Sequence, residues 1–271
     1  MISPLRDILV DGRPGDVFPA DDRGLLYGDG VFRTLRVDAG QPRWWDEQVA
    51  KLGRDCASLG LVAPEPGVWL TDLQHLALPP CNGILKLLVT RGSGERGYRP
   101  PPAARTRRMM VFEAIEFSPD PPTGLTLRVC VLRLGWQPRL AGVKHLNRLE
   151  NVLARAEWDA PEIDEGLLLD QSGKVISGVM SNLFIWQRNR LLTPRLDRCG
   201  VAGLARDRLM QKALAAGIEV QETELDLRAV YEAEEVMLTN SVRGLRRVAR
   251  LEAQCWPDSV ISQRLMDYLN A

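Results

Sequence analysis

Histidine is scarce in this 271-residue sequence, and its cysteines show no pairing pattern. The only two histidines are His75 and His145, which leave little material for a Ser-His-Asp triad or a multi-histidine metal site. The five cysteines are odd in number, widely scattered and contain no C-x-x-C pair, which argues against a disulfide framework and against zinc. If the protein is an enzyme, we expect a lysine or a cofactor to carry its chemistry, with no metal.

Excess charge and long apolar runs are also absent. Thirty-five basic residues balance 35 acidic ones, so no overall field favours nucleic acid or an anionic membrane. No segment approaches the roughly 20 apolar residues that a spanning helix needs, and the N-terminus becomes charged at Arg6 and Asp7 before any apolar stretch develops. We expect a soluble cytoplasmic protein that binds a small molecule rather than nucleic acid or membrane.

A proline-rich connection divides the chain. Three prolines lie within four positions of residues 118–124, which excludes both helix and central strand there. Hydrophobic periodicity predicts strands and helices on both sides of it. The expected strands are 31–37, 84–90, 109–115, 125–134, 166–169, 182–186 and 235–239, and the expected helices include 45–59, 148–158 and 204–216. We therefore predict an α/β (α+β) fold with an N-terminal α+β domain (1–117), a linker (118–124) and a C-terminal α/β domain (125–271) that carries Lys144.

The most informative segment is residues 141–155, A-G-V-K-H-L-N-R-L-E-N-V-L-A-R. Asn147 and Glu150 have the spacing of a helix N-cap and its reciprocal partner, so Lys144 is expected just before a helix start. The positive end of a helix and partial burial would both favour the neutral amine, the form that Schiff-base chemistry requires. Position alone favours a solvated loop lysine instead.

Residues 142–155 resemble the lysine segment of the aminodeoxychorismate lyases, and D-amino-acid aminotransferases share its Lys-x-Leu-Asn core. Both groups belong to the class IV aminotransferase family of fold type IV. The resemblance implies that pyridoxal 5'-phosphate (PLP) is bound to Lys144. It also implies a homodimer that converts 4-amino-4-deoxychorismate to 4-aminobenzoate and pyruvate in folate biosynthesis.

Two further segments extend the resemblance. Residues 22–32, D-R-G-L-L-Y-G-D-G-V-F, are similar to the family's N-terminal motif, and residues 91–98, R-G-S-G-E-R-G-Y, are similar to a lyase loop. By this resemblance Tyr27, Arg91, Arg96 and Tyr98 would bind substrate, because guanidinium groups pair well with carboxylates. Read without it, these stretches are a glycine-rich turn and a solvated basic loop.

Thr34 occupies the position of a threonine that is thought to assist proton transfer in these lyases. Arg33 should face away from it, because successive strand residues alternate between the two faces of a sheet.

The phosphate of the cofactor is expected at two turns. Residues 199–203, C-G-V-A-G, precede a predicted helix whose N-terminal amides could hold an anion, and the resemblance assigns contacts to Val201 and Ala202. Residues 239–241, T-N-S, end a predicted strand, and the resemblance assigns contacts to Ser241 and the Val242 amide. By themselves these residues indicate only turns.

The chain departs from the family pattern at three cofactor positions. Ser177 replaces the glutamate that keeps the pyridine nitrogen protonated, Lys51 replaces a phosphate-binding arginine, and Gln48 replaces a histidine. A serine argues more against transamination than against a lyase, whereas lysine can still neutralise phosphate. Two alternatives therefore remain: a D- or branched-chain aminotransferase, and a homologue that no longer catalyses.

An arginine cluster near the C-terminus is also unusual for the family. It consists of Arg243, Arg246, Arg247 and Arg250. Either a solvated basic surface or a site for substrate carboxylates would account for it.

Overall fold

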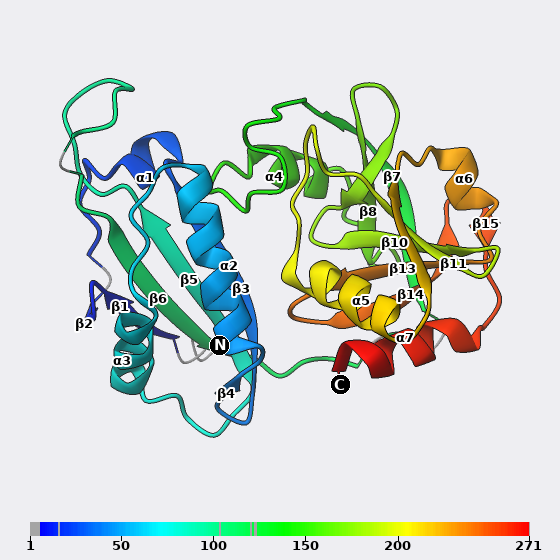
Figure 1. Ribbon diagram of the computed structural model, residues 1–271, viewed down its shortest axis with the longest axis horizontal. Coiled ribbons are helices and arrows are strands. Elements are labelled where there is room, and N and C mark those ends of the chain that lie inside the picture. Colours follow the sequence, from blue (N-terminus) through cyan, green and yellow to red (C-terminus); the bar gives the residue numbers. More distant parts are fainter. Residues whose placement is uncertain (1–5, 16, 103, 120, 122–123, 271) are drawn as a thin grey trace. The chain divides into compact units, whose positions relative to one another are not determined.

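The chain forms two compact units in the computed structural model, which describes residues 6–15, 17–102, 104–119, 121 and 124–270 (Figure 1). Unit 1 comprises Met1–Ser118 and Val143–Asn147, and unit 2 comprises Pro119–Gly142 and Arg148–Ala271. The sequence analysis assigned Lys144 to the second domain, whereas the stretch that contains it packs with unit 1. The predicted domain boundaries otherwise remain a prediction.

Unit 1 is built on an antiparallel sheet in the order β2-β1-β6-β5-β3-β4. Its strands are β1 (Arg6–Val10), β2 (Arg13–Pro14), β3 (Gly30–Asp38), β4 (Gln41–Pro42), β5 (Gly83–Thr90) and β6 (Arg107–Ala114). Its helices are α1 (Arg23–Tyr27), α2 (Trp45–Ser58) and α3 (Pro66–Leu76). Alternate residues of β3 and a helical stripe of α2 fill one core, which contains Val31, Leu35, Leu52 and Cys56.

Unit 2 contains a larger mixed sheet. Its strands are β7 (Leu125–Leu134), β8 (Glu165–Asp170), β9 (Val175–Gly178), β10 (Asn182–Gln187), β11 (Arg190–Pro194), β12 (Glu219–Thr223), β13 (Glu235–Asn240), β14 (Gly244–Leu251) and β15 (Gln254–Cys255). The path β10-β13-β14-β7-β8-β9 closes into a ring, because β9 also pairs with β10 through Ser177 and Asn182.

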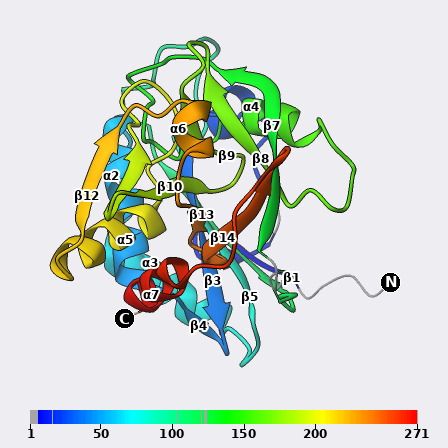
Figure 2. The ribbon, with the colours of Figure 1, turned by 90° about the vertical axis from the view of Figure 1, so that its right-hand side faces the viewer.

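Four helices complete the described part of unit 2: α4 (Leu149–Arg155), α5 (Leu204–Ala215), α6 (Leu227–Tyr231) and α7 (Val260–Asn270). Helices α5 and α7 pack against each other and against β13 and β14 (Figure 2). Among the described residues, no helix combines the length and apolar character that crossing a membrane requires.

The start of α4 differs from the prediction. The helix begins at Leu149, and no side chain caps it. Asn147 Nδ2 instead donates to the Gly28 carbonyl at 3.1 Å, and Glu150 Oε1 accepts from the Gly135 amide at 2.9 Å. The predicted capping box is therefore wrong, because both polar side chains bind other segments of their own units.

Candidate functional site

The Lys144 segment adds a short antiparallel stretch to the first residues of β3. The Phe32 amide donates to the Lys144 carbonyl at 3.0 Å, and the Leu146 amide donates to the Gly30 carbonyl at 2.9 Å. These bonds flank His145 and pair the backbone directly after Lys144 with β3. Lys144 is thus presented by the edge of a sheet rather than by a mobile loop.

The amine of Lys144 lies on the same sheet face as Thr34. Lys144 Nζ is 4.5 Å from the centroid of the Phe32 ring, and strand alternation places Phe32 and Thr34 on one face. Lys86 on β5 pairs in register with Thr34, and its Nζ is 5.5 Å from the same ring. Two amines and a hydroxyl therefore share this face. Sequence reasoning missed Lys86, because only strand pairing brings it beside Thr34.

A buried ion pair lies on the opposite face of β3. Arg33 faces the core, as the alternation predicted, and its guanidinium pairs with the Asp55 carboxylate of α2. Asp55 Oδ2 also accepts from the Lys144 amide at 3.3 Å. The lysine backbone is therefore anchored to α2 as well as to β3. Sequence reasoning missed Asp55, whose partners lie 22 and 89 residues away along the chain.

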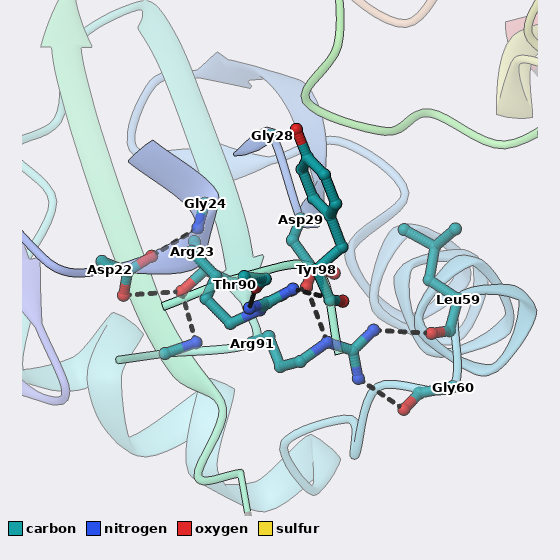
Figure 3. Close-up of polar contacts among 12 residues, drawn as sticks. Asp22, Arg23, Gly24, Gly28, Asp29, Leu59, Gly60, Thr90, Arg91 and Tyr98 are labelled. Carbon is teal, nitrogen blue, oxygen red and sulfur yellow. Dashed lines mark hydrogen bonds and ion pairs between the residues drawn. The ribbon is translucent and has the colours of Figure 1, made fainter. Parts of the chain in front are cut away.

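Arg91 is part of a buried network in unit 1 (Figure 3). Its Nε donates to Asp29 Oδ2 at 2.7 Å, its Nη1 to the Gly60 carbonyl at 3.0 Å and its Nη2 to the Leu59 carbonyl at 2.8 Å. All three guanidinium nitrogens are engaged inside the unit. This geometry gives Arg91 a structural task, and its contact with substrate stays a prediction.

Arg23 binds the same carboxylate and orders the loop that follows Arg91. Its Nε donates to Asp29 at 3.0 Å, and its Nη1 and Nη2 donate to the carbonyls of Gly97 and Tyr98 at 2.8 and 3.0 Å. Burial alone would raise the pKa of Asp29, but the hydrogen bonds and charges of Arg91 and Arg23 outweigh burial and lower it. A single ionised carboxylate thus ties together two arginines and, through Arg23, the loop.

Of the other predicted substrate residues, Arg96 and Tyr98 lie on this loop and Tyr27 ends α1. Tyr98 is 84% exposed, and its ring meets the Tyr27 ring edge-on with 5.4 Å between centroids. Arg96 is exposed beside it. The structure thus brings Tyr27 and Tyr98 together within unit 1, and their contact with substrate stays a prediction, as does that of Arg96.

Unit 2 contains the predicted phosphate turns. The side chain of Asn182, which pairs with Ser177 across β10 and β9, donates to the Val201 carbonyl at 2.8 Å and accepts from the Gly203 amide at 3.1 Å. A Cβ at Gly203 would lie 2.5 Å from Asn182 Oδ1, so this close approach requires glycine. Asn182 therefore shapes the turn that leads into α5.

The first turn of α5 has the properties of an anion cradle. Gly203 caps the helix without a side-chain hydrogen bond, which leaves the first amides uncapped by any side chain. Within the described chain, no acceptor is found for the Val201 amide, whereas the Ala202 amide already donates to the Gly142 carbonyl at 3.0 Å. Of the two predicted backbone contacts, the geometry favours the one at Val201.

The second turn is organised by Asn240. Its Oδ1 accepts from the amides of Val242 and Arg243 at 3.0 and 2.8 Å, and its Nδ2 donates to Ser181 Oγ at 3.2 Å. A phosphate contact by the Val242 amide would therefore have to share that amide with Asn240. Next to Asn240, Thr239 pairs with Asn182, and its Oγ1 is buried with no partner in the described residues.

Ser181 links the second turn to a buried carboxylate. Glu165 is 1% exposed and accepts from the Met180 amide at 2.7 Å, from Ser181 Oγ at 2.8 Å and from Arg246 Nη2 at 3.4 Å. Burial raises the pKa of Glu165, and these donors and the arginine offset that effect only in part.

The C-terminal arginines do not form one uniform basic surface. Arg246 faces the buried Glu165, whereas Arg247 pairs with Asp258 at 2.6 Å and donates to the carbonyls of Trp256 and Pro257. At least these two arginines have structural partners inside unit 2, and Arg250 is exposed.

The remaining cofactor positions lie on two elements. Gln48 and Lys51 lie on α2, four to seven residues before Asp55. Gln48 is 1% exposed, and its Nε2 is buried without a partner in the described chain. Ser177 is buried on β9. In unit 1 the sheet-bound amine suits the aldehyde of PLP. In unit 2 a helix start without a side-chain cap, and a buried hydroxyl with no partner among the described residues, suit its phosphate.

Comparison with known proteins gives a consistent assignment. A family model described as amino-transferase class IV matches residues 30–251. An aminodeoxychorismate lyase from Vibrio harveyi is 32% identical over 269 residues, covering 96% of this chain and 98% of that protein. A putative branched-chain-amino-acid aminotransferase from Methanocaldococcus jannaschii is 32% identical over 241 residues, covering 86% and 82%.

A solved structure extends this similarity to three dimensions. The crystal structure of 4-amino-4-deoxychorismate lyase from Pseudomonas aeruginosa is 40% identical and superimposes with a TM-score of 0.88, covering 97% of this chain and 98% of that one.

Proposed function

Because this chain belongs to the amino-transferase class IV family, we propose that it is a PLP-dependent lyase that converts 4-amino-4-deoxychorismate to 4-aminobenzoate and pyruvate in folate biosynthesis. One observation carries the proposal: the Lys144 amine lies on the Phe32 ring, on the sheet face that also bears Thr34. Similarity to lyases over almost the whole chain supports the choice of reaction.

Each residue that would hold the cofactor has a definite place in its own unit. Lys144 would bind it covalently, and Lys51, Val201, Ser241 and the first amides of α5 would bind its phosphate. Ser177 would face the pyridine nitrogen. When bound, PLP supplies an electron sink for the carbon that carries the substrate's amino group.

The proton steps fall to Lys144 and Thr34. The neutral Lys144 amine removes the proton from the ring carbon that bears nitrogen, and the bond from the ring to the enolpyruvyl oxygen then breaks. Protonation of the departing enolpyruvate by Lys144 or Thr34 gives pyruvate. The remaining ring becomes aromatic, which supplies much of the driving force.

The loop of unit 1 would bind the substrate's carboxylates. Arg96 carries an exposed guanidinium, whose two parallel N–H groups suit a carboxylate. Tyr27 and Tyr98 offer aromatic walls next to it. Arg23 holds the carbonyls of Gly97 and Tyr98, so the loop is pre-organised before substrate arrives.

Ser177 favours the lyase over the aminotransferase alternative. A hydroxyl cannot keep the pyridine nitrogen protonated as a carboxylate can, so stabilisation of carbanion charge is weaker. Aromatisation makes the lyase reaction less dependent on that stabilisation. The similarity to the M. jannaschii protein keeps an aminotransferase as the second candidate.

We also propose that the protein is a cytoplasmic homodimer. The apolar residues Leu149, Val152 and Leu153 of α4, with Met180 in the same unit, are all more than half exposed. A cluster of this kind on a small protein commonly marks an interface. Sedimentation analysis of the purified chain, with Val152→Lys as the test variant, should give a dimer for the wild type and a monomer for the variant.

A product assay tests the proposed reaction. Purified protein with PLP and 4-amino-4-deoxychorismate should release 4-aminobenzoate and pyruvate in equal amounts, with no keto acid added. Lys144→Ala should lower the rate by about 10²–10⁴-fold, the range for losing a general acid–base group, whereas Lys212→Ala on α5 should not. Amino transfer to an added keto acid without pyruvate release would support the aminotransferase, and bound PLP without turnover would support the non-catalytic homologue.

A further inference from the structure

An ion pair occupies the apolar core of unit 1. The side chains of Arg33 and Asp55 are 2% and 4% exposed, and the core beside them is formed by Leu35, Leu52 and Cys56, among others. Burying charges is costly even when they are paired, and apolar residues of similar volume often stabilise a core equally well. Stability alone therefore does not account for this pair.

The carboxylate of the pair has a second partner. Asp55 Oδ2 accepts the Arg33 guanidinium and also the Lys144 amide, which is 3.3 Å away. The Lys144 carbonyl accepts from the Phe32 amide at 3.0 Å. The peptide groups on both sides of the lysine Cα are therefore fixed, one by α2 and one by β3, and the side chain emerges from a clamped backbone.

Unit 1 contains a comparable pair that does not touch the lysine. Asp72 on α3 is buried, and Arg108 Nε and Nη2 donate to its two carboxylate oxygens at 2.6 and 3.1 Å. Within the part of the chain that the structure describes, no hydrogen bond joins this pair to the 143–147 segment. The Arg108 side chain is 23% exposed, so the Asp72–Arg108 pair is a reference for what a buried carboxylate paired with an arginine contributes to stability away from the lysine.

We propose that Arg33 and Asp55 are positioning residues for Lys144: the carboxylate fixes the lysine backbone, and the guanidinium keeps that carboxylate in place. The function of this anchor rests on the proposed role of Lys144 in binding the cofactor. Reactions of this kind need the reacting atoms aligned, and a misplacement of about 1 Å can cost roughly 10²-fold in rate. Clamping the backbone restricts where Nζ can reach.

Amide hydrogen exchange of the cofactor-free protein tests the anchor directly. The Lys144 amide should be protected in the wild type and should exchange at least about tenfold faster in Asp55→Ala, because its acceptor is lost. Asp55→Asn keeps an acceptor oxygen and should restore most of the protection. Asp72→Asn should leave the Lys144 amide unchanged even if it destabilises unit 1.

A doubly apolar variant keeps the test informative if single substitutions unfold the protein. Arg33→Met combined with Asp55→Leu removes both charges together and should fold. We expect its kcat to fall by about tenfold or more while KM changes little, because positioning rather than binding is lost. A folded double variant with a protected Lys144 amide and wild-type kcat would overturn the proposal.

The two proposals fail separately. Hydrogen exchange needs no cofactor, so it reports on the anchor even if the protein never binds PLP. If wild-type protein forms no covalent adduct at Lys144 but the amide responds to Asp55 as expected, the anchor stands and the proposed function falls. If the adduct forms at Lys144 but exchange of the Lys144 amide does not change when Asp55 is substituted, the proposed function stands and the anchor falls.

Discussion

Each unit contains a carboxylate next to predicted site residues, partly buried in unit 1 and fully buried in unit 2, and the two carboxylates are stabilised in different ways. Asp29 in unit 1 binds two arginines and has a lowered pKa. Glu165 in unit 2 binds an amide and a hydroxyl, with one arginine at 3.4 Å, and burial raises its pKa. For Asp29, the two close arginines outweigh the effect of desolvation on the pKa. For Glu165, the neutral donors and the more distant arginine do not outweigh it.

The difference gives the two carboxylates opposite effects on stability as pH changes. The folded pKa of Asp29 lies below its ordinary value of 3.8. Ionised Asp29 therefore stabilises the folded state above pH 3.8, and this stabilisation is lost as pH falls through the folded pKa. The folded pKa of Glu165 lies above its ordinary value of 4.5. The stability associated with protonated Glu165 is therefore fully present below pH 4.5 and is lost as pH rises through the folded pKa.

The largest effect is expected when Asp29 is neutralised. Asp29→Asn leaves Arg23 and Arg91 without their shared charge and should lower the free energy of unfolding by about 3–5 kcal/mol, the range for a broken buried pair. Urea unfolding at neutral pH measures this loss.

Asp38 provides the matched control for Asp29. It also binds two arginines, Arg36 and Arg43, but is 38% exposed, so Asp38→Asn should cost no more than about 1 kcal/mol. Equal losses in the two variants would show that burial does not distinguish these carboxylates.

The second effect is a change in the pH dependence of unfolding. Glu165→Gln carries no titrating group, so the variant should lack the part of the stability loss that the wild type shows as pH rises above 4.5. Below that pH, the two proteins should differ by only about 1 kcal/mol, the net value of a hydrogen bond. Urea unfolding from pH 4 upward would contradict this account if the two profiles stayed parallel.

A smaller effect is expected at the second turn. Asn240→Ala removes the acceptor for the Val242 and Arg243 amides, which should cost about 1–2 kcal/mol of stability and weaken PLP binding, because the turn loses its preformed shape. Asn82→Ala removes a similar acceptor, for the Ala39 amide in unit 1, and should leave PLP affinity unchanged. Tighter PLP binding in Asn240→Ala would mean that Asn240 competes with phosphate for the Val242 amide.

The smallest effect concerns reaction choice. Ser177→Glu introduces the carboxylate that the family usually carries and should raise the ratio of amino transfer to pyruvate release by less than about tenfold, equivalent to 1.4 kcal/mol. Product ratios with and without an added keto acid measure it. A ratio that falls would contradict the role assigned to Ser177.

Periodicity and motifs in the sequence predicted much of this architecture. The strand 125–134 is β7 to the residue, and α2 and α5 end within one residue of their predicted limits. These segments carry a regular apolar pattern bounded by loop residues, so local preference and tertiary packing agree. The family resemblance, rather than the pattern, located Lys144.

Side-chain partners over long sequence distances could not be predicted. Arg91 resembled a substrate ligand in its motif, yet its acceptors are carbonyls 31 and 32 residues away. Asp55 was one acidic residue among several on a helix until folding brought the Lys144 amide to it. Asn147 had the right spacing for a cap, but a carbonyl of another segment binds it instead.

The most direct test of the central claim is to map the lysine that binds PLP. Purified protein is incubated with PLP, reduced with borohydride, digested and analysed for the labelled peptide. We expect label on Lys144. No adduct, or label on Lys86, the other amine on the Phe32 ring, would contradict it.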